Sequence, residues 1–155
     1  MEIRIDDPAN PAIATLLAAH VAEQRANTPA GFSFALDASG LRRPDVTFWT
    51  AWNGETPIGM GALRALDAES GEVKSMRTAD AWRGRGVGAA MLAAIVAAAR
   101  ARGYARLYLE TGVTPAYAPA LSLYTRAGFV TCAPFGDYAA SPHNQFLTLD
   151  LQGRH

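Results

Sequence analysis

The sequence predicts a single α/β domain of the α+β type, with a mixed, mostly antiparallel sheet around a central β-α-β unit. Three strand-like segments in the middle of the chain are separated only by short turns, which favours an antiparallel meander. The third segment leads through a glycine-rich loop into an alanine-rich helix and then another strand, and this order implies a right-handed parallel crossover. A length of 155 residues suits one domain spanning 1–155.

The remaining elements follow from hydrophobic periodicity and turn signals. The Asn53-Gly54 pair between the first two meander strands is a strong hairpin signal. We expect strands over residues 2–5, 46–52, 57–66, 72–78, 104–110, 129–132 and 145–151. We expect helices over residues 11–26, 88–102 and 115–127, and an irregular stretch over 28–45 with room for one helical turn.

Composition excludes several classes of protein. Lys+Arg and Asp+Glu are each 14, so the net charge is zero, whereas nucleic-acid binders normally carry a basic excess. The most apolar run, residues 87–99, is too short to span a bilayer, so no membrane association is expected. A single cysteine, Cys132, cannot form an internal disulfide and is typical of a cytoplasmic protein. The histidines lack metal-ligand spacing, so no metal is expected.

The loop at residues 83–88 (RGRGVG), directly before the long helix, predicts an anion-binding site. Its glycines let the backbone approach a ligand closely. The helix that follows begins with unpaired N–H groups and a partial positive charge. Together with two arginines, these features favour a phosphate or pyrophosphate ligand.

The glycines of this loop, taken alone, allow two interpretations. Gly84, Gly86 and Ala89 fit the G-x-G-x-x-A fingerprint of dinucleotide-binding folds, and Glu110 lies about 20 residues further on, where a ribose-binding acid is expected. The context is unfavourable, because residues 78–82 separate the loop from a strand that is amphipathic rather than buried. A Walker loop is excluded, since no Gly-Lys-Ser/Thr follows.

The second interpretation rests on two motifs. Arg83-x-x-Gly86-x-Gly88 resembles the R/Q-x-x-G-x-G/A signature with which the GNAT superfamily of N-acetyltransferases binds the pyrophosphate of acetyl-CoA. Residues 120–129 (ALSLYTRAGF) resemble that family's A-x-x-L-Y-x-x-x-G-F segment, and the order of elements agrees over nearly the whole chain. The segments GEVKSMRT, LYLETG and PFGDY further resemble a YsnE-like subgroup. One departure is Tyr117, which stands where many members carry asparagine.

The resemblance implies an acetyl-CoA-dependent N-acetyltransferase that transfers the acetyl group directly to the amine of a small-molecule acceptor. It implies that Tyr124 is the general acid that protonates the departing thiolate. The implied acetyl-CoA-binding residues are Met76, Arg77, Thr78, Arg83, Gly84, Arg85, Gly86, Val87, Gly88 and Ala89. The alternative function is a non-catalytic acyl-CoA-binding or sensing module.

Glu72 is the candidate general base, because it lies in the strand that forms one wall of the implied cleft. The competing interpretation is a solvated glutamate paired with Lys74 or Arg77. Glu110, at the end of the opposing strand, is the alternative base. His20 lies beside the apolar face of the first helix, which favours a packing role.

Two segments are expected to form the acceptor pocket, residues 28–45 and 133–144. Both mix aromatic and charged side chains, which suits a small acceptor with an apolar body and a polar or carboxylate end. We expect Arg42, Arg43 and Tyr138 to contact the acceptor. The competing interpretation is that these segments only cover the core or form the contact of a homodimer.

Overall fold

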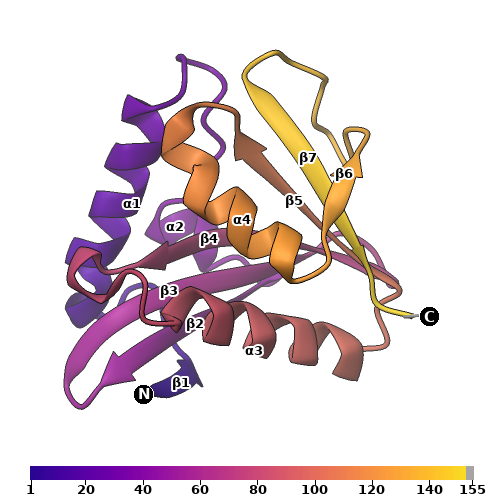
Figure 1. Ribbon diagram of the computed structural model, residues 1–155. Helices are drawn as coiled ribbons and strands as arrows, with labels where there is room; N and C mark the ends of the chain where they lie inside the picture. The colour runs from indigo at the N-terminus through magenta and orange to yellow at the C-terminus, as the bar shows by residue number, and fades with distance from the viewer. Residues whose placement is uncertain (153–155) are drawn as a thin grey trace.

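The computed structural model describes residues 1–152, so the predicted domain end at residue 155 lies outside the described part. Its centre is a seven-stranded sheet in the order β1-β2-β3-β4-β5-β7-β6 (Figure 1). The strands are β1 (Glu2–Ile5), β2 (Val46–Asn53), β3 (Thr56–Ala65), β4 (Ser70–Thr78), β5 (Arg106–Gly112), β6 (Val130–Cys132) and β7 (Asn144–Asp150). All neighbouring strands are antiparallel except β4 and β5, which confirms the predicted mixed sheet.

Helices cover both faces of the sheet. They are α1 (Ala14–Ala26), α2 (Ala38–Leu41), α3 (Val87–Ala101) and α4 (Ala118–Arg126), with short 3₁₀ turns at Pro11–Ile13, Asp80–Trp82 and Pro115–Tyr117. Apolar residues of α1 and α2 form one core cluster with β2 and β3. Residues of α3 and α4 form a second and larger cluster with β2, β3, β4, β5 and β7. The sheet is therefore the middle layer between two helical layers.

The sequence-based boundaries agree with the structure to within about two residues, because turn and cap residues mark most of them. One helical turn, α2, does occur within the irregular segment 28–45. The insertion of β7 between β5 and β6 was not predicted, since periodicity alone does not specify which strands pair. In the part of the chain that the structure describes, no helix is both long enough and apolar enough to cross a membrane.

Helix α3 packs directly against glycines of the sheet. Its buried face carries Val87, Met91 and Ile95, spaced four residues apart as on one helical face. A Cβ atom at Gly59 of β3 would lie 2.7 Å from Cγ1 of Val87, so only glycine fits there without a shift. This contact holds the start of α3 against β3 and therefore sets where the preceding loop lies.

The two parallel strands part after a short paired region. β4 and β5 pair only from Ser70↔Arg106 to Glu72↔Tyr108, and they then diverge toward their carboxyl ends (Figure 1). The register between β3 and β4 also shifts between Met60 and Ala62, next to Ser75, whose φ of 57° is unusual for a residue with a side chain. This bulge turns the end of β4 away from β5 and leaves one strand edge without a partner strand.

Candidate active site

A cavity of about 400 Å³ lies where β4 and β5 part, between α1, the start of α3 and α4. It brings together residues that are far apart in the chain. Nine of the ten predicted acetyl-CoA-binding residues line it: Met76, Arg77, Thr78, Arg83, Gly84, Gly86, Val87, Gly88 and Ala89. Tyr124 lines the same cavity from α4. We call it the cofactor cavity.

Arg85 is the exception among the predicted residues. Its guanidinium carbon lies 4.9 Å from the ring centroid of Trp82, a cation–π distance, and Arg85 does not line the cofactor cavity. The sequence showed two arginines in one loop but could not show which of them faces inward. A contact between Arg85 and a phosphate stays a prediction.

The loop before α3 has the local geometry of an anion site. Gly84 and Gly86 have φ values of 75° and 84°, a conformation that side chains disfavour. Gly86 is the N-cap of α3, and no side chain caps the first N–H groups of the helix. These donors and the helix dipole therefore face the cavity and suit a pyrophosphate.

A salt-bridge network joins this loop to α1. The buried guanidinium of Arg77 donates to Oε2 of Glu23 over 2.6 Å. Arg83 lies 3.5 Å from the same carboxylate oxygen and 3.0 Å from Oδ1 of Asp80. Arg83 is half exposed, so an incoming anion can compete for it, whereas the buried Arg77 mainly orders the cavity wall.

Tyr124 is almost fully buried, yet it lines the cofactor cavity. Its ring packs edge-on against Phe129, with centroids 5.7 Å apart. Burial raises the pKa of the Tyr124 hydroxyl above its ordinary value of 10.0. The hydroxyl therefore stays protonated near neutral pH and can donate a proton to an anion that forms beside it.

Tyr117 fills the position where the resembled family often has asparagine, and its role in the structure is structural. Its hydroxyl lies 2.6 Å from Oγ1 of Thr28 and donates to Oε1 of Gln24 over 3.2 Å. Its ring lies directly on Gly112, where a side chain would collide with it. Tyr117 thus fastens α1 and the following segment to the end of β5.

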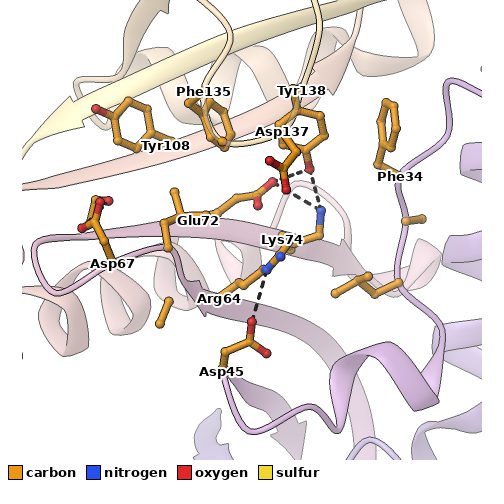
Figure 2. Close-up of a pocket in the computed structure, with 16 residues that line it drawn as sticks. Phe34, Asp45, Arg64, Asp67, Glu72, Lys74, Tyr108, Phe135, Asp137 and Tyr138 are labelled. Atoms are coloured by element: carbon orange, nitrogen blue, oxygen red, sulfur yellow. Dashed lines mark hydrogen bonds and ion pairs between the residues drawn. The ribbon is translucent and has the colours of Figure 1, made fainter.

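A second cavity, of about 820 Å³, lies beside the part of β4 that still pairs with β5, and it is lined by residues of β3, β4 and β5 and by two irregular segments (Figure 2). Residues 34–36 and 135–138 line it, so both segments predicted to form the acceptor pocket contribute. We call it the acceptor cavity.

Two of the predicted acceptor contacts do not lie in this cavity. Arg42 lies 3.6 Å from Asp7 and Arg43 lies 3.4 Å from Asp45, and neither arginine lines the cavity. Both side chains form exposed ion pairs instead, so this cavity gives the predicted contact of Arg42 and Arg43 with the acceptor no support, and that contact stays a prediction. The cations that do line the cavity are Arg64 and Lys74. The only sequence signal for Arg64 and Lys74 was the alternation of side chains along a strand. Both residues lie on the same face of the sheet as Glu72.

Glu72 lies on the floor of the acceptor cavity with a side chain only 1% exposed. Tyr138 donates its hydroxyl to Oε2 of Glu72 over 2.6 Å, and Nζ of Lys74 lies 3.3 Å from the same oxygen (Figure 2). Within residues 1–152, Oε1 of Glu72 is buried and has no hydrogen-bond donor. The contact with Lys74 agrees with the competing interpretation, in which Glu72 is paired with a nearby cation. The burial of Glu72 disagrees with it, because that interpretation places the carboxylate in solvent.

A buried carboxylate oxygen without a donor costs stability, so it calls for a hydrogen-bonding partner such as a ligand or a water molecule. The Tyr138 hydroxyl that supports Glu72 remains a donor, because burial and the charge of Glu72 raise its pKa. The free Oε1 therefore has the chemistry to accept a hydrogen bond or a proton from an amine.

Glu110 lies on β5 across the parting from β4. Its Oε2 accepts a hydrogen bond from the side-chain amide of Asn144, whose Oδ1 is itself buried without a donor among the described residues. Burial raises the pKa of Glu110 above its ordinary value of 4.5, and the charge of Glu72 adds to the shift. The two acids are therefore close enough to influence each other, and Glu110 remains a second candidate base.

His20 is buried, as expected for a packing residue, and it also borders the cofactor cavity. Burial, together with the charge of Arg77, lowers its pKa to about 4, so the imidazole is neutral near pH 7. Among residues 1–152, no three His, Cys, Asp or Glu side chains gather closely enough to hold a metal ion.

Comparison with known proteins identifies the class. The model of the Acetyltransferase (GNAT) family matches residues 13–129. The uncharacterized N-acetyltransferase YedL of Escherichia coli is 44% identical over 149 residues, which are 96% of this chain and 94% of that protein. The uncharacterized N-acetyltransferase YsnE of Bacillus subtilis is 40% identical over 151 residues, 97% of this chain and 100% of that protein.

Solved structures agree. A protein from Klebsiella pneumoniae assigned as an acyl-CoA N-acyltransferase superposes with a TM-score of 0.78 at 28% identity, covering 97% of each chain. A GNAT family acetyltransferase from Elizabethkingia anophelis with acetyl-CoA bound has a TM-score of 0.63 at 17% identity over 96% and 97% of the two chains, and it shows the shared fold. The fold and the matches define an acyltransferase. The chain belongs to the GNAT acetyltransferase family, and its predicted YsnE-like resemblance is confirmed.

Replacing Glu110 by glutamine should stabilise the protein in a pH-dependent way. Because burial raises its pKa above 4.5, the folded state holds the Glu110 proton more tightly than the unfolded state does. The contribution of Glu110 to the stability is fully present below the pKa that the group has in the unfolded chain. This contribution is lost as the pH rises through the higher pKa that the group has in the folded protein. In chemical denaturation between about pH 4 and pH 8, the free energy of unfolding of Glu110→Gln should increasingly exceed that of the wild type.

The matched control is Glu55→Gln, at an exposed glutamate in the β2–β3 hairpin. It should leave the pH dependence of the unfolding free energy unchanged. A difference between Glu110→Gln and the wild type that does not vary with pH would show that the Glu110 carboxyl is not held protonated by the fold.

Proposed function

We propose that this protein is an acetyl-CoA-dependent N-acetyltransferase that acetylates the amine of a small molecule directly. The observation that carries the proposal is the parting of β4 from β5. A cavity with an anion-binding loop lies at the end of β4, at residues 76–78, and a cavity with a buried carboxylate lies beside the preceding part of the same strand. Donor and acceptor would therefore meet along β4.

The cofactor cavity fits acetyl-CoA in charge and in backbone geometry. Residues 83–89 would hold the pyrophosphate through the α3 N-terminus, the glycine backbone and Arg83. The free edge of β4 at residues 76–78 would hold the pantetheine arm by strand-like hydrogen bonds. The bound acetyl-CoA supplies the thioester that the reaction consumes.

The proposed step forms one bond and breaks another. The neutral amine nitrogen of the acceptor bonds to the thioester carbonyl carbon, and the carbon–sulfur bond breaks with its electron pair going to sulfur. Oε1 of Glu72 takes the proton that the nitrogen loses, directly or through a water molecule. The Tyr124 hydroxyl donates a proton to the sulfur, so that the products are an amide and free CoA thiol.

The similar proteins also support this assignment. Both YedL and YsnE are described as N-acetyltransferases, and the Elizabethkingia anophelis protein holds acetyl-CoA. The direct assay is release of free thiol from acetyl-CoA across a panel of primary amines and amino acids. Tight acetyl-CoA binding without thiol release for any acceptor would contradict the proposal and support a non-catalytic sensing module.

Tyr124→Phe should lower kcat by about 10²-fold or more, because it removes only the hydroxyl that protonates the thiolate. The affinity for acetyl-CoA, measured by calorimetry, should change little. Tyr117→Phe is the matched control, since it removes the other tyrosine hydroxyl that lines the cofactor cavity. It should lower the melting temperature and leave kcat within a few-fold of the wild type. Equal kcat losses in both variants would assign Tyr124 to packing.

Glu72→Gln should remove both most of the turnover and the acidic limb of the pH profile of kcat/KM for the acceptor. Glutamine keeps an oxygen for the Tyr138 hydroxyl but cannot accept the amine proton at this stage of the reaction. The profile is measured with acetyl-CoA saturating. If the acidic limb persists in Glu72→Gln and disappears in Glu110→Gln, then Glu110 is the base.

A further inference from the structure

Resting on this proposed function, we infer that Arg64 is the anchor for a carboxylate of the acceptor. The acceptor is then a molecule of the amino-acid class, with a primary amine, a carboxylate and an apolar, preferably aromatic, body. The inference depends on how Arg64, Glu72 and an aromatic wall are arranged around the acceptor cavity (Figure 2).

Arg64 lies in the cavity with most of its hydrogen-bonding capacity unused. Its side chain is 33% exposed, and its Nε donates to Oδ2 of Asp45 over a long 3.4 Å. Among the described residues, this is the one hydrogen bond that the guanidinium makes, so both terminal nitrogens are available. A guanidinium with two open N–H₂ groups binds a carboxylate in a fork geometry that a lysine cannot reproduce.

Arg64 and Glu72 are cross-strand partners in the β3–β4 register, and both line the acceptor cavity. Side chains in such a pair start only about 5 Å apart. The two opposite charges nevertheless form no salt bridge, because Arg64 turns to Asp45 and Glu72 turns to Lys74 and Tyr138. The cavity floor thus presents a separate cation and anion. A zwitterion complements this pair, with its carboxylate on Arg64 and its amine at Oε1 of Glu72.

Lys74 is the other cation in the cavity, but it already has partners. Its Nζ lies 3.3 Å from Glu72 and 3.0 Å from the Tyr138 hydroxyl, and its side chain is only 7% exposed. Lys74 therefore holds Glu72 in position, whereas Arg64 is open to a ligand.

The acidic residues of the cavity do not prevent a carboxylate from binding to Arg64. Asp67 and Asp137 lie exposed at the rim, where solvent screens their charges. Oδ1 of Asp67 also accepts hydrogen bonds from Ser70 and the backbone of residue 69. The more buried charges are balanced, since the cations of Arg64 and Lys74 face the carboxylates of Asp45 and Glu72.

An aromatic wall faces these charges. Tyr108 stacks on Phe135 with centroids 4.9 Å apart, Phe135 meets Tyr138 at 5.1 Å, and Tyr138 meets Phe34 at 5.1 Å. Figure 2 shows the rings of Tyr108, Phe135 and Tyr138 along one side of the cavity and the side chains of Arg64, Lys74 and Asp45 along the other. A ligand held at Arg64 and Glu72 would lay its apolar body against these rings.

The test compares matched ligands on the full-length protein. Binding of phenylalanine and of phenethylamine, which lacks only the carboxylate, is measured by calorimetry with CoA saturating, and kcat/KM is measured with acetyl-CoA. The wild type should prefer phenylalanine by about 10-fold or more. Arg64→Gln should weaken phenylalanine binding and raise its KM by about 10- to 100-fold, with little change for phenethylamine. Arg64→Lys should restore only part of the preference.

Arg43→Gln is the matched control, because Arg43 also pairs with Asp45 but does not line the cavity. It should leave the preference for phenylalanine intact, and thermal melts confirm that each variant is folded. Equal or tighter wild-type binding of phenethylamine, or equal losses for both ligands in Arg64→Gln, would overturn the inference. Tighter binding of a diamine such as cadaverine than of either ligand would also overturn the inference. It would indicate that Asp67 and Asp137 at the rim bind the second ammonium group. Carboxylate-selective binding without acetyl transfer would support Arg64 as an anchor and refute the proposed function.

Discussion

The parting of β4 from β5 is the constraint on which the rest of the site depends. The strands pair for three residues each, from Ser70↔Arg106 to Glu72↔Tyr108, and then separate. Beyond that point one edge of β4 has no partner strand, which is unstable in a sheet interior unless other groups satisfy it. The bulge at Ser75, with its positive φ, makes the separation possible by turning the end of β4. A strained, partly unpaired strand at the centre of a sheet is a typical sign of a binding site.

The two cavities beside this strand are built in different ways. The cofactor cavity comes mainly from one continuous unit, the end of β4, the loop and the start of α3, completed by α4 and α1. The acceptor cavity combines β3 and β4 with two irregular segments that are about a hundred residues apart. Changes in those segments can alter the acceptor while the cofactor geometry stays the same. The separation of the two sets of residues explains why the family could be recognised from sequence and the acceptor could not.

Much of the fold was predictable because its signals are local. The Asn53-Gly54 turn, the glycine loop and the face of α3 each lie within a few residues, and the structure has all three. The resemblance to the GNAT family, which rests on short motifs, indicated the ten loop and strand residues of which nine line one cavity. Arg85 is the exception, because its stacking on Trp82 depends on a side-chain choice that a sequence pattern does not encode.

The charged groups of the acceptor cavity required information that no local pattern contains. Arg64 faces Glu72 only because of the β3–β4 register, and Tyr138 reaches Glu72 from a segment 66 residues further along the chain. Arg42 and Arg43 have the expected charge in the expected segment, but α2 directs them to Asp7 and Asp45 instead. Composition therefore indicated that cations would lie near this cavity, but it did not indicate that Arg64 and Lys74 are the ones that line it.

The central claim is that donor and acceptor meet beside β4, between Tyr124 and Glu72. A crystal structure of the protein with CoA and an amine-bearing acceptor tests it most directly. The account predicts that the CoA sulfur faces the Tyr124 hydroxyl and that the acceptor nitrogen lies within hydrogen-bond distance, about 3 Å, of Oε1 of Glu72. A CoA whose pantetheine arm lies outside the parting of β4 and β5, or an acceptor nitrogen turned away from Glu72, would contradict it.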